Sequence, residues 1–191
     1  MAVTSTSMNP NVGDKVGFAP SSRTRAQRKT LITVAEWGTG STPNREVLGA
    51  RTEDSSIEFN ADIVKSTDIL GITYADVNKT EPQQTFDPFF LLGDSALSKY
   101  LVEAALENRI TDYNGKFTIY IIAAFLNNGT DSSAPTAYKT VKHTGCSIIP
   151  TSMGGDAYVS MPIEVHYSNE ITTGTVDKLA DGFQFTPDTT T

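Results

Sequence analysis

The residues of this chain best suited to chemistry are two histidines and the single cysteine, His143, His166 and Cys146. A thiol beside an imidazole could form a nucleophile–base pair, and the same groups could ligate zinc. Both histidines fall in predicted strands, where a spacing of three places His143 and Cys146 on opposite faces. Because no third or fourth ligand type is at hand, we interpret them as structural or surface residues and expect no metal site.

Two other patterns are weaker candidates for a reactive site. The stretch GTGS at 38–41 resembles part of a phosphate-binding loop, but Pro43 and Asn44 stand where that loop needs glycine and lysine. Glu58 and Asp62 lie four residues apart on one predicted strand, so their Cα atoms are ~13 Å apart and the carboxylates cannot share a proton. The sequence therefore predicts a protein that is not an enzyme and binds no cofactor.

Composition narrows the class of protein further. A lone cysteine excludes an internal disulfide and favours a reducing compartment. The first 14 residues lack the pattern of a secretory signal, and the apolar run at 119–126 is shorter than the ~20 residues of a membrane helix. We expect a soluble protein made and kept inside a cell.

Charge is unevenly distributed along the chain. Residues 1–30 hold five basic residues and one acidic residue, whereas the remainder holds 10 basic and 21 acidic residues. A basic arm on an acidic body could bind nucleic acid or dock on a neighbouring copy, and its modest charge favours the neighbour or plain solvation. We predict an extended N-terminal arm at 1–28, followed by one domain at 29–191 that includes a long surface loop at 38–55.

The elements that position these residues are mostly strands. A first strand is predicted at 29–37, and alternating runs at 56–69 and 70–80 predict a long hairpin. One face of its first strand is apolar and is expected to cover a core, and the other is polar and acidic. The apolar face holds Ile57, Phe59, Ala61 and Ile63, and the polar face holds Ser56, Glu58, Asn60 and Asp62.

The second half of the chain predicts one helix and further strands. Residues 94–109 combine a capping Asp94 or Ser95 with an apolar stripe at helical spacing. Strands are predicted at 116–127, 136–150, 156–170 and 181–188, and the first of these is apolar on both faces, as expected for a central strand or one pressed against another subunit. Six or seven strands and one helix predict a mainly β, β-rich α+β fold.

The stretch SIEFNADIVKSTDILGITYADVNKTEPQQTFDPF at 56–89 resembles the major tail tube proteins of long-tailed phages that infect Gram-positive bacteria. The pieces EFNADI, STDI followed by GITY, DVNKTEP and FDPF carry the resemblance. The helix and late strands follow in the order of that family, so the resemblance extends over residues 29–186.

The resemblance implies a β-sandwich-like domain with a helix on its flank. It further implies hexameric rings in which two long hairpins of each subunit join a continuous β-barrel, and which stack into the tube through which the genome passes. Expected partners are other copies of the chain, a tape-measure protein, and tail terminator or baseplate proteins. Double-stranded DNA would transit without specific binding, no membrane would be involved, and the protein would be part of the virion tail after assembly in the host cytoplasm.

Residue roles follow from this resemblance as hypotheses. The polar face with Glu58, Asn60 and Asp62 would line the lumen and repel DNA phosphates. Contacts between subunits or rings would come from the arm and the long loop, through Arg23, Arg25, Arg28, Arg45 and Arg51. The alternative is a monomeric or dimeric β-sandwich binding module that uses the loop 38–55 for recognition.

Overall fold

The computed structural model describes residues 28–38, 43–50, 52, 55–127, 137–177 and 183–189. The N-terminal arm up to residue 27, with Arg23 and Arg25, lies outside the described residues, as does Arg51. The strands are β1 (Leu31–Trp37), β2 (Asn44–Leu48), β3 (Ile57–Glu58), β4 (Ala61–Thr67), β5 (Thr73–Thr80), β6 (Gln83–Phe86), β7 (Phe117–Asn127), β8 (Ala137–Pro150), β9 (Ile163–His166), β10 (Ile171–Asp177) and β11 (Phe185–Pro187). The helices are α2 (Ala96–Leu106) and two short 3₁₀ turns, η2 (Arg28–Thr30) and η3 (Ile110–Tyr113).

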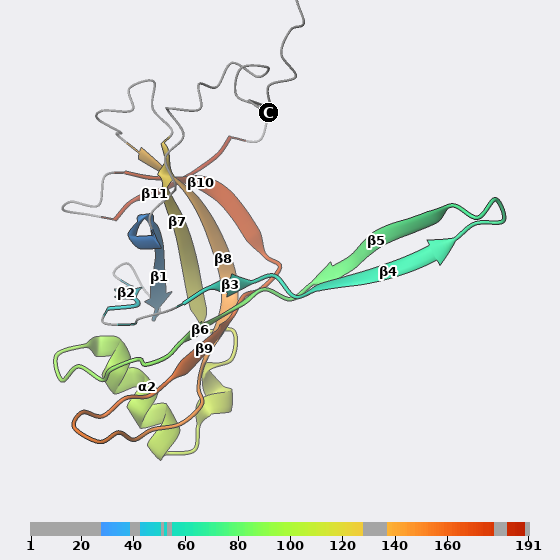
Figure 1. Cartoon of the computed structure of the whole chain (residues 1–191). Helices are drawn as coiled ribbons and strands as arrows, with labels where there is room; N and C mark the ends of the chain where they lie inside the picture. Colours follow the sequence, from blue (N-terminus) through green and yellow to red (C-terminus); the bar gives the residue numbers. More distant parts are fainter. Residues whose placement is uncertain are drawn as a thin grey trace, which may run out of the picture.

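Most of the strands form one curled sheet in the order β2-β1-β7-β8-β9-β6-β3. The long strand β8 pairs with β10 along its first half and with β9 along its last four residues, and β11 extends the sheet beyond β10. Figure 1 shows α2 at one end of this sheet and the β4–β5 hairpin projecting away from it. The predicted class, mainly β with a helix on the flank, is confirmed.

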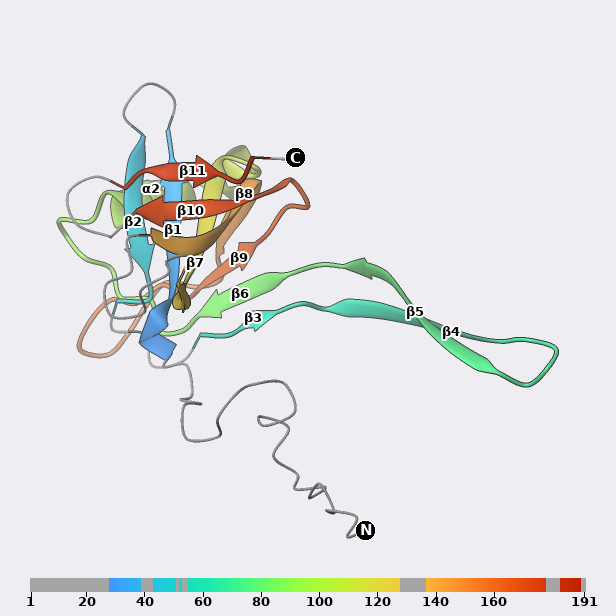
Figure 2. The same ribbon diagram turned by 90° about the horizontal axis from the view of Figure 1, so that it is seen from above.

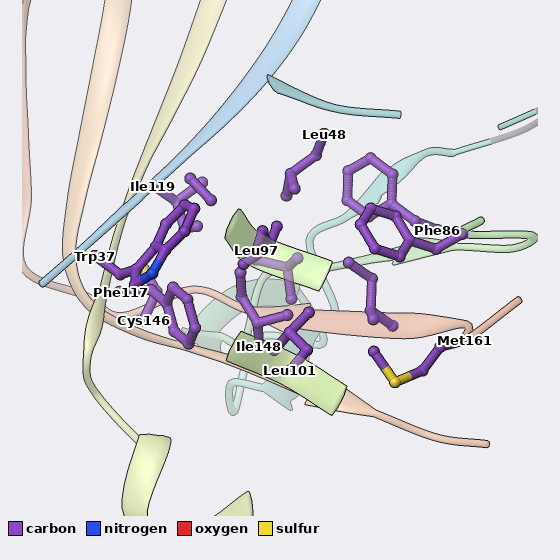
Figure 3. Close-up of a cluster of buried hydrophobic side chains, with 14 of the residues drawn as sticks. Trp37, Leu48, Phe86, Leu97, Leu101, Phe117, Ile119, Cys146, Ile148 and Met161 are labelled. Atoms are coloured by element: carbon purple, nitrogen blue, oxygen red, sulfur yellow. The ribbon is translucent and has the colours of Figure 1, made fainter. Parts of the chain in front are cut away.

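The main core lies between the sheet and α2. Leu97, Leu101 and Ala104 of the helix are buried, and Trp37 and Phe117 pack beside them from β1 and β7 (Figure 3). Ser95 caps the helix, because its side-chain oxygen accepts a hydrogen bond from the backbone of Ser98 at 2.9 Å. The predicted helix is therefore confirmed, within narrower bounds than 94–109.

Strand β7 is apolar on both faces because it is central within its own chain. Its Phe117 and Ile119 face the main core, whereas Tyr120 and Ile122 belong to a second, smaller cluster that Phe183 and Phe185 cover. The sequence left open whether another subunit covers this strand. Over the first half of β7, the main core covers one face and the C-terminal segment covers the other.

A buried polar network fastens the root of the projecting hairpin to the body. Gln84 of β6 is fully buried, and its side-chain oxygen accepts hydrogen bonds from Thr33 at 3.1 Å and from the hydroxyl of Tyr167 at 2.5 Å. Its amide nitrogen donates to Ser55 at 2.9 Å, directly before β3. Because every bond is made in a buried place, the network fixes β6 and the entry to β3 against β1.

Two predictions about the strands are corrected. The segment 38–55 is not a continuous loop, because β2 lies within it and pairs with β1. The predicted strand 156–170 contains only β9 in its second half, and β10 follows after a break. None of the described helices has both the length and the apolar character needed to cross a bilayer.

Candidate assembly surface

The β4–β5 hairpin extends from the body as an isolated two-stranded arm. Among the described residues, β4 and β5 pair only with each other. The hairpin continues outward from the β3–β6 pair at the edge of the sheet, and Figure 2 shows that its far end lies well away from the body. The predicted long hairpin is confirmed, and its two outer edges carry backbone groups without a strand partner in the described part of the chain.

The apolar side chains of this arm do not cover a core of their own chain. Phe59 is 67% exposed and Ile63 is 57% exposed, and only Ile57 at the root is half-buried. The prediction that this face covers a core was wrong for the single chain. A period of two residues determines which side chains share a face, and it does not require that the apolar face be covered within the same chain.

The arm has two distinct faces. On one face, called here the Ile63 face, lie Ala61, Ile63, Lys65, Thr67, Thr73, Ala75 and Val77. On the other, called here the Asp62 face, lie Asp62, Val64, Ser66, Tyr74, Asp76 and Lys79, which is paired directly with Asp62. The register shifts at Asn78, whose side chain donates a hydrogen bond to Asp62 at 3.1 Å. Both described carboxylates of the paired strands therefore lie on the Asp62 face, together with Lys79, whereas Lys65 lies on the other face.

The predicted polar face is interrupted before it reaches the arm. Asn60 has a φ of 43°, which breaks the extended chain between β3 and β4, and its amide donates to the backbone oxygen of Glu81 at 3.1 Å. Glu58 lies at the root, where it accepts a weak hydrogen bond from Gln83 at 3.4 Å. Simple alternation therefore does not place Glu58 on the same face as Asp62.

The tip of the arm is held in a fixed turn by Asp68. One carboxylate oxygen accepts hydrogen bonds from the backbone of Leu70 and Ile72, both at 2.9 Å, and the other accepts one from the hydroxyl of Tyr74 at 3.2 Å. These bonds, led by the one from Ile72, lower the pKa of the Asp68 carboxyl. The turn presents two aliphatic side chains to solvent, with Ile69 fully exposed and Leu70 78% exposed.

An apolar groove lies at the root of the arm. Its volume is about 630 Å³, and it runs between the root and the face of the sheet formed by β1, β7, β8 and β10. Its apolar walls include Ile57, Phe59, Ile121, Val141 and Ile171. Burying a side chain of this size contributes ~1.5–3 kcal/mol, so the groove and the tip are both apolar surfaces that gain stability when covered.

The described arginines that were predicted to join subunits make contacts within the chain. Arg28 donates to the backbone oxygens of Ser55 at 2.9 Å and Leu31 at 2.6 Å. Arg45 forms an ion pair with Glu36 at 2.5 Å and lies over the ring of Phe183. Their proposed role between subunits remains a prediction.

The cysteine and histidines are structural in the described residues. A bulge at Gly145 inserts one residue into β8, so His143 and Cys146 are both buried and do not lie on opposite faces as predicted. The ring of His143 packs against Tyr167 with centroids 4.9 Å apart and the ring planes inclined at 55°, and burial raises the pKa of the Cys146 thiol. His166 pairs with Glu164 at 3.4 Å on the surface. No group of three metal-ligating side chains occurs in the part of the chain that the structure describes.

Comparison with known proteins finds similarity only at the level of structure. No protein-family model matches the chain, and no curated protein matches it. The chain is similar to a protein of the anti-feeding prophage baseplate, with 14% identity, a TM-score of 0.43, and coverage of 79% of this chain and 96% of that chain. It is also similar to a protein of the tube-terminating cap of the same prophage, with 15% identity, a TM-score of 0.43, and coverage of 92% and 99%. At such TM-scores the backbones superpose only in part, so neither similarity supports an inference about function.

Proposed function

We propose that this chain is a structural, non-enzymatic subunit that polymerises as stacked hexameric rings to form a phage tail tube. The observation that carries the proposal is the β4–β5 arm, whose residues are exposed on both faces apart from the half-buried Asp68 at its tip. An isolated two-stranded hairpin with open edges is marginally stable and prone to uncontrolled pairing. Incorporation into a closed sheet built from several copies removes both problems.

The number of subunits and the stacking rest on the resemblance of residues 56–89 to tail tube proteins. A contact in which the arm of one copy meets the body of the next is heterologous, and such contacts close into a ring when the rotation permits. Stacking of rings would then use other surfaces, and we assign it to the N-terminal arm and to Arg28, Arg45 and Arg51.

The charge of the arm suits a channel for DNA. We assign the Asp62 face to the lumen, because Asp62 and Asp76 would repel the phosphates of a passing genome. Lys and Arg contacts dominate binding to phosphates through counterion release. Lys65 lies on the opposite face, and Lys79, which shares the Asp62 face, is ion-paired with Glu81 at 2.6 Å. Glu58 and Asn60, at the root, join this proposed lining on the resemblance alone, since Asn60 interrupts the alternation between Glu58 and Asp62. In this proposal the protein is part of the virion tail, beside a tape-measure protein and the terminator or baseplate proteins.

Electron microscopy of the purified full-length chain tests the proposal. Rings or tubes of uniform width are expected, because the arm finds its partner in other copies. Small uniform particles at high concentration would contradict it and would favour a monomeric or dimeric binding module.

Charge reversal tests the assignment of the lumen separately from assembly. A phage that carries Glu58→Lys and Asp62→Lys should form normal tubes but eject its DNA slowly or not at all. The matched control is Asp156→Lys with Glu170→Lys, which adds the same charge at exposed positions of the body. Normal ejection by the first variant would remove the lumen assignment.

A further inference from the structure

Two apolar surfaces of the described chain lie uncovered at opposite ends of the arm. One is the tip, formed by Ile69 and Leu70, and the other is the groove at the root. We propose that the tip of one copy docks into the root groove of the next copy. This inference rests on the proposed function and deepens it, because it names the two surfaces that join neighbouring subunits.

The tip is apolar, exposed and held in one conformation, as expected for a side-chain group that docks into a pocket. The side chain of Ile69 is fully exposed and that of Leu70 is 78% exposed, so no described residue covers either of them. The hydrogen bonds from Leu70, Ile72 and Tyr74 to Asp68 fix the turn before any partner arrives. A rigid apolar anchor loses little conformational entropy on docking, which favours binding.

The groove has the properties of a receptor for an apolar group. Phe59 and Ile171 stand 67% and 53% exposed in its walls. The guanidinium of Arg28, which also lines the groove, is already held by two backbone oxygens. His143 likewise has its Nδ1 within 2.9 Å of the backbone oxygen of Ser168. An aliphatic occupant therefore displaces water from apolar walls without stripping these two polar groups of their partners.

A tip that docks in this groove comes from another copy, because the arm points away from its own groove. The seven residues of β4 alone separate root and tip by roughly 23 Å at ~3.3 Å per residue, and both views show the arm directed outward from the body (Figures 1 and 2). Bending the tip back would break the β4–β5 ladder. Donor and receptor are different surfaces, so the contact propagates from one subunit to the next, and it closes a ring when the rotation between copies permits.

Cysteine cross-linking of the full-length chain tests the docking. Equimolar Leu70→Cys and Ile171→Cys proteins, mixed under oxidising conditions, should give a disulfide-linked dimer, and a chain with both changes should give a ladder of covalent oligomers. The native Cys146 is fully buried and stays unreactive in the folded protein. As a matched control, Leu70→Cys mixed with Tyr158→Cys, which is 74% exposed outside the groove, should give no dimer.

A second variant separates this inference from the proposed function. Ile69→Asp with Leu70→Asp should leave the melting temperature of the dispersed protein unchanged and abolish rings in electron micrographs. Rings that persist in this variant, without a cross-link between Leu70→Cys and Ile171→Cys, would overturn the docking and leave the tube intact. Absence of rings from the unaltered protein would overturn both.

The N-terminal arm is the competing occupant, since it joins the body at Arg28 beside the groove. A chain with Ala19→Cys and Ile171→Cys reports on it. A disulfide within single chains of this variant, together with no cross-link from the tip, would assign the groove to the arm and overturn the proposal.

Discussion

Replacement of Gln84 by leucine should loosen the root of the arm and destabilise the protein. Gln84 makes three hydrogen bonds in a fully buried place, to Thr33, Tyr167 and Ser55. Leucine is of similar size but has no polar atoms, so three hydroxyl groups lose their partner. A net ~1 kcal/mol for each of the three bonds, with a further ~1–3 kcal/mol for one hydroxyl left unsatisfied, gives a loss of about 4–6 kcal/mol in the free energy of unfolding.

Guanidinium and thermal denaturation followed by circular dichroism measure this loss on the dispersed protein. For a chain of this size, ~1 kcal/mol corresponds to a change of ~2–4 °C, so Tm should fall by roughly 8–24 °C. The adjacent Gln83→Leu is the matched control, because its side chain reaches only the exposed Glu58 at 3.4 Å and should change stability by less than ~0.5 kcal/mol. A loss below ~1 kcal/mol for Gln84→Leu would refute the network as the anchor of the root.

Three further predictions concern the helix, a buried phenol and the tip. Leu101→Asp places a charge in the main core and should abolish the cooperative melt, whereas Leu106→Asp, 69% exposed on the same helix, should melt like the parent. Burial is the main cause, and the nearby carboxylate of Glu36 the second cause, of a rise in the pKa of Tyr120 from 10.0 to about 12. Folding therefore favours the neutral phenol, which adds to the free energy of unfolding below pH 10, and this addition is lost as the pH rises from 10 to 12. Denaturation measured across this pH range should show a steeper loss of stability for the parent protein than for Tyr120→Phe. Asp68→Ala removes the acceptor at the tip and should speed amide hydrogen exchange at Ile72, measured by NMR; an unchanged rate would show that the turn does not depend on Asp68.

The helix and the hairpin could be predicted because their signals are local. Ser95 and the apolar stripe with Leu97 and Leu101 specify both the start and the buried face of α2. Two alternating runs separated by turn residues specify the β4–β5 pair. The chemistry of each short segment is sufficient for these assignments.

The environment of the arm could not be predicted from its alternation. A period of two residues shows that Ile63 and Asp62 lie on different faces, but it does not say which molecule covers the apolar one. In the single chain nothing does, because Ile63 is 57% exposed. The sequence therefore predicts the strand, but only the structure shows that its apolar face is uncovered in the single chain.

Other features depend on single residues whose effect is not periodic. The bulge at Gly145 reverses the faces of β8, so His143 and Cys146 are both buried. Gln83 and Gln84 are identical in the sequence, yet only Gln84 reaches the buried hydroxyls of Thr33 and Tyr167. A buried glutamine carries no local signal, because its partners come from strands far along the chain.

Hydrogen–deuterium exchange of the arm over a series of protein concentrations tests the central claim most directly. The outward-facing amides of β4 and β5 should exchange rapidly at low concentration, because these strands pair only with each other in the described chain. At high concentration the same amides should become protected as copies associate, while those of β7 and β8 remain protected throughout. Exchange of the arm at one rate over the whole series would contradict the claim that other copies of the chain complete it.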